Sequence, residues 1–280
     1  MPDKKIVELI ESMPNADKNA KPDGPPRSEV ESKYDTILTG GRQVVVGVVD
    51  LLKPDAEQGD YKARQALFNT AWQAGKQGNE KIRASFAASL AGELSADRDS
   101  GIKRYLLELL RICATDAQAP AIGKLLDDKE LYDDAALTLL RIGKAGASHI
   151  RKAAQSAKGI ARLTMLQNLG ELGDKQSVVL LRSGTEDSDA HVRVTAALSL
   201  SKLGDAGSVQ HVLKVADAKD VDSFERRNGT KAALVLAENL ADAGKKDEAA
   251  KIYKHLFNSR TDVSERYVRQ AATIGLEQIE

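Results

Sequence analysis

Residues 189–205, DAHVRVTAALSLSKLGD, have the pattern of a short helix with one packed face. Leu200 and Leu203 lie three residues apart, which places them on the same side of a helix, and the small alanine pair at 196–197 lets a neighbouring helix approach closely. Asp189 can accept hydrogen bonds from the free amides of a first turn, and Gly204 can adopt the left-handed conformation that ends a helix. The stretch therefore predicts one amphipathic helix with defined ends.

The same pattern returns about every 30 residues along the chain. Shifted back by 31 residues, the positions of Arg193, Leu200, Leu203, Gly204 and Asp205 fall on Arg162, Leu169, Leu172, Gly173 and Asp174. Seven helices of this kind are predicted, near residues 60–75, 99–113, 130–143, 160–172, 189–204, 222–242 and 263–279. The period has room for two short helices and two turns. Because one helix pair cannot bury its own apolar face, successive pairs must stack.

The N-terminal part of the chain has a different composition. Six of the seven prolines lie before residue 55, and residues 13–28 predict an irregular linker after a short first helix. The valine-rich run at 44–49 is flanked by helical spacing, so a helix is predicted there. The predicted organisation is an N-terminal helical cap with a Pro-rich linker over residues 1–40, followed by a stack of helix pairs over residues 41–280.

An acidic residue, then Val-Arg, a small-residue pair and Leu-Gly-Asp, as found in residues 189–205, resembles the second helix of a HEAT repeat. The period is similar to that of the short bacterial HEAT repeats of phycobilisome-lyase-like proteins. This resemblance covers roughly residues 41–280. It implies an all-α protein, an α-solenoid (α-α superhelix) of about seven HEAT-like helix pairs with an N-terminal helical cap. Tyr132 departs from the pattern, because it stands where the repeat has arginine.

The charge balance and the apolar runs bear on the class of partner. The chain has 41 Lys and Arg residues and 41 Asp and Glu residues, so its formal net charge is zero. Binding to nucleic acid or to an anionic membrane needs clustered positive charge, so neither is expected as a partner. The longest apolar run, residues 44–49, is far shorter than the ~20 residues of a membrane span. Acidic residues interrupt the N-terminal apolar cluster, which does not fit a secretory signal. A cytoplasmic monomer is expected.

The sequence contains no recognisable catalytic or metal-binding motif. The one cysteine, Cys113, occupies the helix-ending position that glycine fills in other repeats, so a packing role is predicted for it. The four histidines are followed by Ile150, Val192, Val212 and Leu256. The His-Glu pairs that hold a di-iron site in a HEAT-fold hydroxylase are therefore missing. No catalytic residue, metal site or cofactor is predicted, and the chain is expected not to be an enzyme.

In HEAT solenoids the second helix of each pair lines the concave side, so the resemblance implies that the polar positions of these helices form a contact surface. The predicted concave stripe consists of Arg104, Glu108, Arg111, Asp134, Arg141, Asn168, Glu171, Ser199, Lys202 and Lys231. Its charges are mixed, which favours a protein or peptide partner over a phosphate backbone. The predicted function is a non-catalytic scaffold for protein–protein interaction.

Two other functions are alternatives for a chain of this kind. One is a chromophore- or substrate-handling protein similar to the lyase-like HEAT proteins, although an aromatic content of 4% is low for a pigment pocket. The other is a DNA-binding HEAT protein similar to the alkylpurine glycosylases, which the balanced charge disfavours. The only tryptophan, Trp72, lies one helical turn after Phe68. An exposed pair of this kind would be an anchor for a partner, but the pair is expected to be buried at the N-terminal end of the stack.

Overall fold

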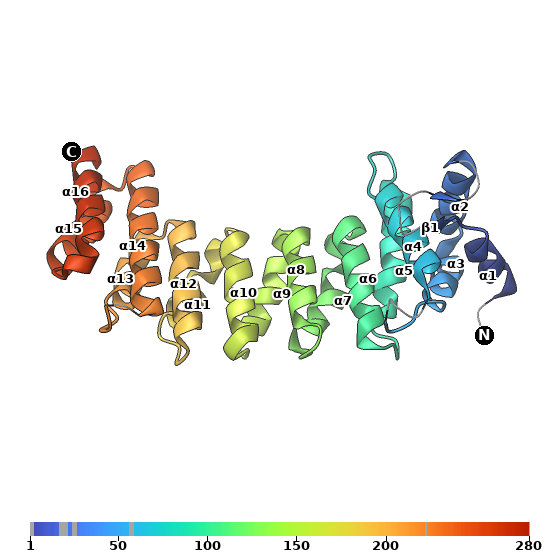
Figure 1. Cartoon of the computed structure of the whole chain (residues 1–280), viewed down its shortest axis with the longest axis horizontal. Coiled ribbons are helices and arrows are strands. Elements are labelled where there is room, and N and C mark those ends of the chain that lie inside the picture. Colours follow the sequence, from blue (N-terminus) through green and yellow to red (C-terminus); the bar gives the residue numbers. More distant parts are fainter. Residues whose placement is uncertain (1–2, 17–21, 24–26, 56–58, 222, 280) are drawn as a thin grey trace. The chain divides into compact units, whose positions relative to one another are not determined.

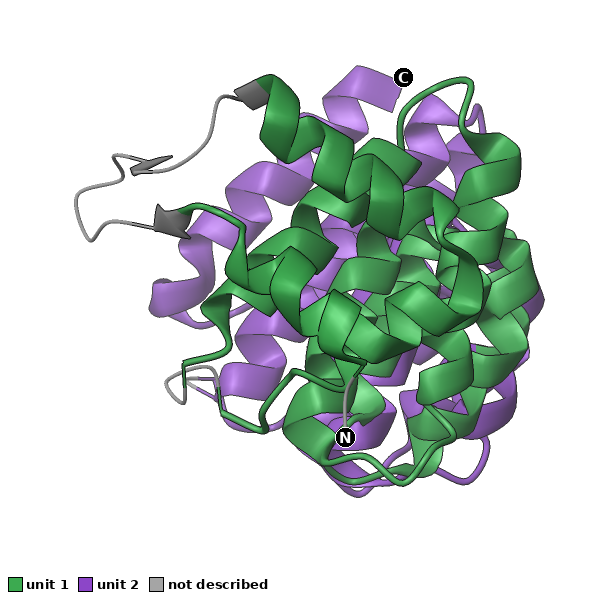
Figure 2. Ribbon diagram, turned by 90° about the vertical axis from the view of Figure 1, so that its right-hand side faces the viewer, with its two compact units in different colours: residues 1–149 green, residues 150–280 purple. Residues whose placement is uncertain are grey.

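The structure, a computed structural model, describes the whole chain except residues 1–2, 17–21, 24–26, 56–58, 222 and 280 (Figure 1). The chain forms two compact units, residues 1–149 and residues 150–280 (Figure 2). Each unit is a stack of helices with its own buried core.

The first unit begins with a short helix and a small two-stranded ribbon. Its helices are α1 (Lys4–Glu11), α2 (Arg27–Thr39), α3 (Gly41–Val49), α4 (Tyr61–Ala74), α5 (Glu80–Glu93), α6 (Ser100–Cys113), α7 (Ala119–Gly123) and α8 (Tyr132–Ile142), with 3-10 turns at η2 (Asp116–Gln118) and η3 (Lys124–Asp127). The strands β1 (Asn15–Ala16) and β2 (Pro22–Asp23) pair antiparallel. The predicted linker thus contains this ribbon, and its residues 17–21 and 24–26 lie outside the described residues. The boundary between the units falls within α9 (Lys144–Ala154).

The second unit consists of helices joined by short turns. Its elements are α10 (Gly159–Glu171), α11 (Val178–Gly184), α12 (Ala190–Leu203), α13 (Val209–Ala216), α14 (Phe224–Asp242), α15 (Lys246–Ser259) and α16 (Arg266–Ile279), with 3-10 turns at η4 (Lys175–Ser177), η5 (Ala206–Ser208) and η6 (Val263–Glu265). Helix α12 lies within residues 189–205, the stretch whose pattern repeats along the sequence.

Helices of the same kind pack on one another within each unit. In the first unit the second helices α4, α6 and α8 contact in succession, and the first helices α3, α5 and α7 do the same beside them. Because α1 contacts α3 and α2 contacts α4, the N-terminal helices extend these two layers. In the second unit α10, α12, α14 and α16 contact in succession. The second helices thus form a continuous layer in each unit.

The ends and the packed face of α12 follow from its sequence. The Asp189 carboxylate accepts a hydrogen bond from the His191 amide at 2.8 Å, and Gly204 ends the helix in the left-handed conformation with φ +61°. Ala196 and Leu200 are completely buried. Small side chains at such positions let neighbouring helices approach, and leucines fill the space between them.

The predicted fold class is confirmed: this is an all-α protein whose helices α3 to α16 follow one another as seven HEAT-like pairs. The seven predicted second helices correspond to α4, α6, α8, α10, α12, α14 and α16, and the valine-rich run forms α3. The division at residues 40 and 41 stays a prediction. Across the described part of the chain, none of the helices combines the length and the apolar character needed to cross a membrane.

Candidate functional site

The predicted contact residues all belong to second helices. We name the solvent-facing side of these helices the second-helix face. The predicted contact residues lie on α6 (Arg104, Glu108 and Arg111), α8 (Asp134 and Arg141), α10 (Asn168 and Glu171), α12 (Ser199 and Lys202) and α14 (Lys231). The structure brings these residues together in small groups within each unit. That any of them binds a partner stays a prediction.

In the first unit, charges of the second-helix face pair between neighbouring helices. Arg104 Nε lies 3.1 Å from Asp134 Oδ2, and Arg111 Nη2 lies 3.6 Å from the other oxygen of the same carboxylate. Arg111 also lies 3.9 Å from Glu108 within α6. Such partly exposed ion pairs contribute about 0–1 kcal/mol each, so they leave these side chains free to exchange partners at little cost.

In the second unit, Lys202 on α12 pairs with Glu171 on α10 across the same face. Both side chains are more than 40% exposed, so this pair also contributes little to the free energy of unfolding. Lys231 on α14 is exposed and has no ion-pair partner among the residues that the structure describes. This face therefore carries both cations and anions in the second unit, as it does in the first.

Two of the predicted contact residues, Asn168 and Ser199, are placed elsewhere by the structure: they are 5% and 3% exposed and do not lie on the accessible surface. The Ser199 hydroxyl donates a hydrogen bond to the Leu166 carbonyl on α10 at 3.0 Å. The helices approach so closely here that a Cβ atom at Gly170 would lie 2.4 Å from Ser199 Oγ. The physical reason for the correction is this contact between second helices, which covers the middle position of the stripe.

A series of arginine-carboxylate pairs, which is distinct from the exposed charges, links successive second helices in the second unit. Arg193 donates to Glu225 with two hydrogen bonds of 2.5 and 2.6 Å, and Arg226 donates to Glu265 with two of 2.8 Å. Arg162 makes the corresponding pair with Asp187 at 3.0 Å. The hydrogen bonds that Arg193 donates to the Glu225 carboxylate raise the pKa of the Arg193 guanidinium. These arginine and carboxylate side chains pair with one another and stabilise the contacts between successive second helices.

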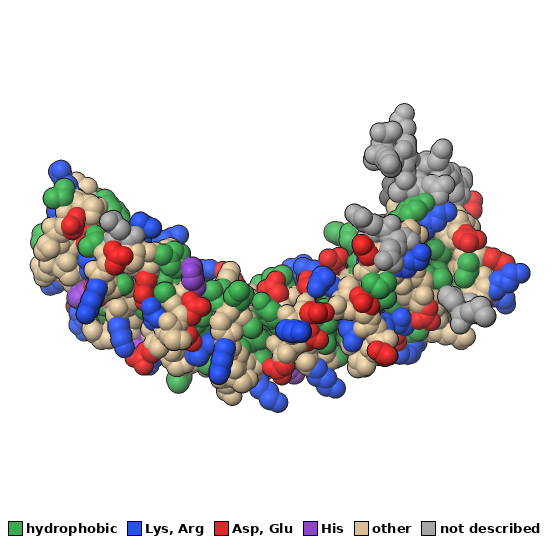
Figure 3. Space-filling view, turned by 60° about the horizontal axis from the view of Figure 1, so that its bottom comes forward, with side chains coloured by type: hydrophobic (Ala, Val, Ile, Leu, Met, Phe, Trp, Pro, Cys, Tyr) green, Lys and Arg blue, Asp and Glu red, His purple; other side chains and the backbone are tan. Residues whose placement is uncertain are grey.

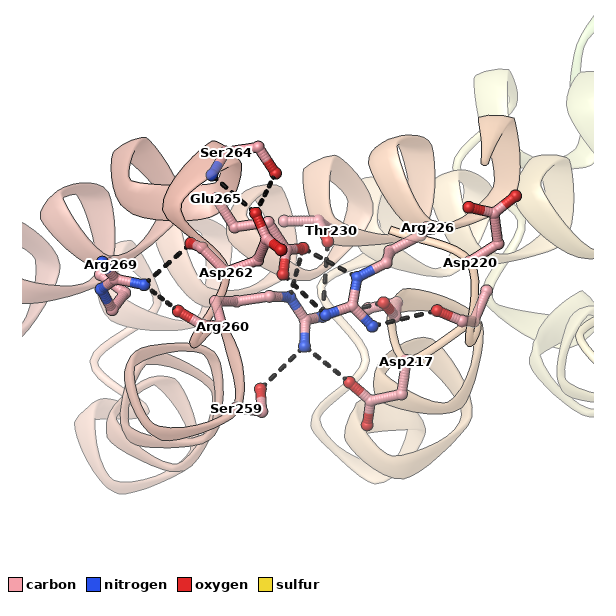
Figure 4. Close-up of polar contacts among 12 residues, drawn as sticks. Asp217, Asp220, Arg226, Thr230, Ser259, Arg260, Asp262, Ser264, Glu265 and Arg269 are labelled. Carbon is pink, nitrogen blue, oxygen red and sulfur yellow. Dashed lines mark hydrogen bonds and ion pairs between the residues drawn. The ribbon is translucent and has the colours of Figure 1, made fainter. Parts of the chain in front are cut away.

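The C-terminal pair of this series extends into a buried polar cluster (Figure 4). Arg260 is fully buried, with its guanidinium 2.9 Å from Asp217 and 3.4 Å from Glu265, and it donates to the Ala216 carbonyl at 2.8 Å. The cluster joins the residues before α14 to the turn before α16. Because Arg260 and Glu265 are buried and face one another, and Asp217 is only partly exposed, the cluster is a structural feature and not an open site.

An open groove lies on the second-helix face of the first unit, where α4, α6 and α8 adjoin. Its volume is about 820 Å³, and its apolar lining comes from Trp72, Ile112, Leu137 and Leu140. Trp72 is 57% exposed and contacts Phe68, which is 43% exposed, with ring centroids 6.5 Å apart in an edge arrangement. The prediction that this aromatic pair is buried is therefore wrong, because the alanines on the opposite side of α4 make the core contacts.

The cationic lining of the groove comes from Lys76, Arg111 and Arg141. Within the described parts of the chain, Lys76 and Arg141 have no ion-pair partner, and both are exposed. Two predicted contact residues, Arg111 and Arg141, thus lie in the groove, while Trp72 was expected to be buried and Leu137 was not predicted. The spacing of Leu137 and Arg141, four residues apart on the pattern of a second helix, was the signal that could have found this site.

Reactive side chains are not gathered at this site. Burial raises the pKa of the Cys113 thiol to about 12, and the thiol donates a hydrogen bond to the Leu109 carbonyl at 3.3 Å. A thiol of this kind is not a nucleophile near neutral pH. Over the described ranges, no group of three or more His, Cys, Asp and Glu side chains is placed to hold a metal ion.

Comparison with known proteins connects this architecture to the HEAT repeats. Residues 147–234 match the family model described as HEAT repeats. No curated protein matches the chain in sequence.

Three solved structures are similar to the chain at low identity. Human deoxyhypusine hydroxylase in complex with glycerol is 13% identical with a TM-score of 0.35, over 99% of this chain and 96% of that one. The complex of CpcE and CpcF of phycocyanin lyase from Nostoc sp. PCC7120 is 14% identical with a TM-score of 0.34, over 100% and 96%. The archaeal HEAT-like repeats protein from Thermococcus onnurineus NA1 is 12% identical with a TM-score of 0.38, over 92% and 99%.

These matches contradict the prediction that the chain is not an enzyme, because two of the three structures bear the names of a hydroxylase and a lyase. A fold class does not by itself decide for or against catalysis. At these identities and TM-scores no activity transfers to this chain. The chain is an all-α protein of the α-solenoid class, built of HEAT-like helix pairs, and its residues 147–234 match the HEAT-repeat family.

Proposed function

We propose that the chain is a protein-interaction scaffold that binds a protein or peptide partner on its second-helix face. The observation that carries this proposal is the exposed apolar cluster of Phe68, Trp72 and Leu137 beside the groove. Single exposed apolar residues are common, but a cluster that includes the only tryptophan is typical of a binding surface. The core contacts of α4 do not need it, because Ala66 and Ala71 make them.

The charge pattern supports a polypeptide partner. In both units, lysine and arginine side chains are interleaved with aspartate and glutamate on the face shown in Figure 3. A surface that follows a nucleic-acid backbone is expected to carry one sign of charge over its length. A surface with charges of both signs suits a partner whose surface also carries both signs. A monomer in the cytoplasm stays the expectation for the free protein.

The proposal is tested by affinity capture from the native cell with quantitative mass spectrometry. The bait is the full chain as wild type, and as a variant that combines Trp72→Ala with Leu137→Ala. A partner of the second-helix face is expected to be captured by the wild type and reduced by about tenfold or more with the variant, because truncating aromatic hot-spot residues costs at least ~2 kcal/mol.

A matched control combines Val179→Ala with Val263→Ala, since these residues are 77% and 84% exposed but lie on α11 and η6, outside the second-helix face. Circular dichroism verifies that both variants are folded. Each captured protein is then purified and its affinity for the three chains is measured by calorimetry. Equal binding to all three would overturn the proposal.

The alternative of a chromophore- or substrate-handling protein has its own test. Incubation of the chain with linear tetrapyrroles, followed by gel filtration and absorbance, measures whether a pigment stays bound. A stoichiometric pigment would favour that alternative over the scaffold.

A further inference from the structure

The groove of the first unit combines an apolar lining with cationic side chains, and this combination indicates the chemical class of its partner. The apolar side chains Ile112, Leu137 and Leu140 line it together with the indole ring of Trp72. Its volume of about 820 Å³ lies within the range of ligand-binding clefts and has room for the side chains of a bound segment. Burying such side chains against exposed indole and leucine surface stabilises a complex by ~25 cal/mol for each Å² removed from water.

Three cationic side chains, Lys76, Arg111 and Arg141, line the same groove, and no carboxylate belongs to its lining. Arg111 and Arg141 lie in the last turns of α6 and α8, where a cation is favourable for the helix itself. This favourable interaction with the helix ends explains Arg111 and Arg141, but it does not explain the apolar wall beside them. It does not explain Lys76 either, because Lys76 lies outside the helix, after the C-cap of α4 at Gly75. Lys76 and Arg141 keep their charge uncompensated by any described side chain.

We infer that this groove binds an acidic peptide segment of a partner protein, with a leucine or phenylalanine anchor flanked by aspartate or glutamate. This inference rests on the proposed function and names the chemistry of the partner at one site. The anchor would lie against Trp72 and Leu137, and the flanking carboxylates would face Lys76 and Arg141. Charge complementarity argues for an acidic segment, because Arg111 already pairs with carboxylates, whereas Lys76 and Arg141 have no counter-ion among the described residues.

A nucleic acid could also use an aromatic ring beside cations, because bases stack on such rings. The surroundings of the groove favour the peptide. Glu108 and Asp134 adjoin Arg111, so the positive charge does not continue along a track for successive phosphates. The wall opposite Trp72 is aliphatic, which suits a side chain more than a base.

The experiment uses the fluorescence of Trp72, the only tryptophan in the 280 residues, as a reporter inside the groove. The probe is the tryptophan-free peptide acetyl-Glu-Glu-Leu-Phe-Glu-Glu-amide, titrated into the full chain. The expected result is a saturable blue shift of the Trp72 emission, with an affinity that falls several-fold from low to high salt because charges contribute. Peptides with Leu-Phe replaced by Ser-Ser, or with every Glu replaced by Lys, are expected to give no saturable shift.

Variants of the chain locate the binding. Arg141→Glu and Lys76→Glu are each expected to lower the affinity for the acidic peptide by about fivefold or more, since each replaces an attractive charge with a repulsive one. The matched control Lys251→Glu reverses an exposed lysine on α15 and is expected to change the affinity by less than twofold. A short oligothymidylate is titrated in parallel. Circular dichroism verifies that every variant is folded.

The inference is overturned if the acidic peptide gives no saturable shift, if the Ser-Ser peptide binds as well, if Lys251→Glu weakens binding as much as Arg141→Glu, or if the oligothymidylate binds more tightly than the peptide. Its failure can be distinguished from that of the scaffold proposal. Cellular partners that are lost with the Trp72 and Leu137 variant, but do not contain an acidic segment that binds, would leave the scaffold proposal intact.

Discussion

The fully buried guanidinium of Arg260 is the residue on which the polar cluster of the second unit depends. Removing a charge from water costs several kcal/mol, and only close countercharges and hydrogen bonds offset that cost. Arg260 obtains them from Asp217, Glu265 and the Ala216 carbonyl (Figure 4). Arg260 thereby connects the end of α13 to the turn before α16 through two hydrogen bonds and one ion pair.

We expect Arg260→Met to lower the free energy of unfolding by about 3 kcal/mol, since the methionine keeps much of the volume but leaves buried acceptors without their donor. Urea denaturation followed by circular dichroism measures this loss. The matched control is Arg266→Met on the exposed start of α16, for which a change below about 0.5 kcal/mol is expected. A loss below about 1 kcal/mol for Arg260→Met would contradict the importance of the cluster.

At the scale of the elements, the Val-Arg signature of the repeat has a physical role. In the second unit the arginine of each second helix reaches an acidic residue at the start of the next one, as Arg193 reaches Glu225. The two side chains are 24% and 17% exposed, so solvent weakens this pair less than it weakens a surface pair. Two parallel hydrogen bonds also fix the register between the helices.

A double-mutant cycle with Arg193→Ala and Glu225→Ala is expected to give a coupling energy of about 1.5–3 kcal/mol. The matched control is the cycle of Lys214→Ala and Glu186→Ala, whose side chains are 65% and 58% exposed and pair at 3.0 Å. That pair should couple by about 1 kcal/mol or less. Urea denaturation of the single and double variants measures both values. Equal coupling in the two cycles would show that the arginine series does not hold the stack together.

A helix could be predicted from the sequence where its periodicity and its end residues lie in the helix itself or directly beside it. The second helices were predicted well because their periodicity and ends are local, as with Asp189 and Gly204 in α12. The bounds of the short α7 and its 3-10 turns were not predicted, although the capping box between Thr115 and Gln118 and Pro120 at the helix start are local signals that mark them.

The candidate site was less predictable, because exposure depends on the neighbouring repeat. Ser199 has the polarity of a surface residue, but Gly170 on α10 lets the two helices approach until the serine is covered. Trp72 has the size of a core residue, but no described element covers its side of α4, and it stays exposed. A pattern within one helix shows which side is apolar or small, and it does not show how closely the next helix approaches.

At the scale of the whole molecule, the two compact units have separate cores. Leu106 in the first unit and Leu200 in the second are both completely buried. In a stack of repeats each pair contacts only its neighbours, so the stability of one part depends mainly on local contacts. Trp72 reports on the first unit alone, whereas far-ultraviolet circular dichroism reports on the helices of both.

We therefore expect Leu200→Ala, which creates a cavity costing about 2–5 kcal/mol, to lower the urea midpoint of the circular dichroism transition and to leave the Trp72 midpoint nearly unchanged. The matched variant Leu106→Ala should lower the Trp72 midpoint as well as the circular dichroism midpoint, because its cavity lies in the same unit as the tryptophan. Midpoints that shift together by both probes in both variants would mean that the chain unfolds as one cooperative block. A separation of the probes would mean that a partner bound to the groove stabilises the first unit without stabilising the second to the same extent.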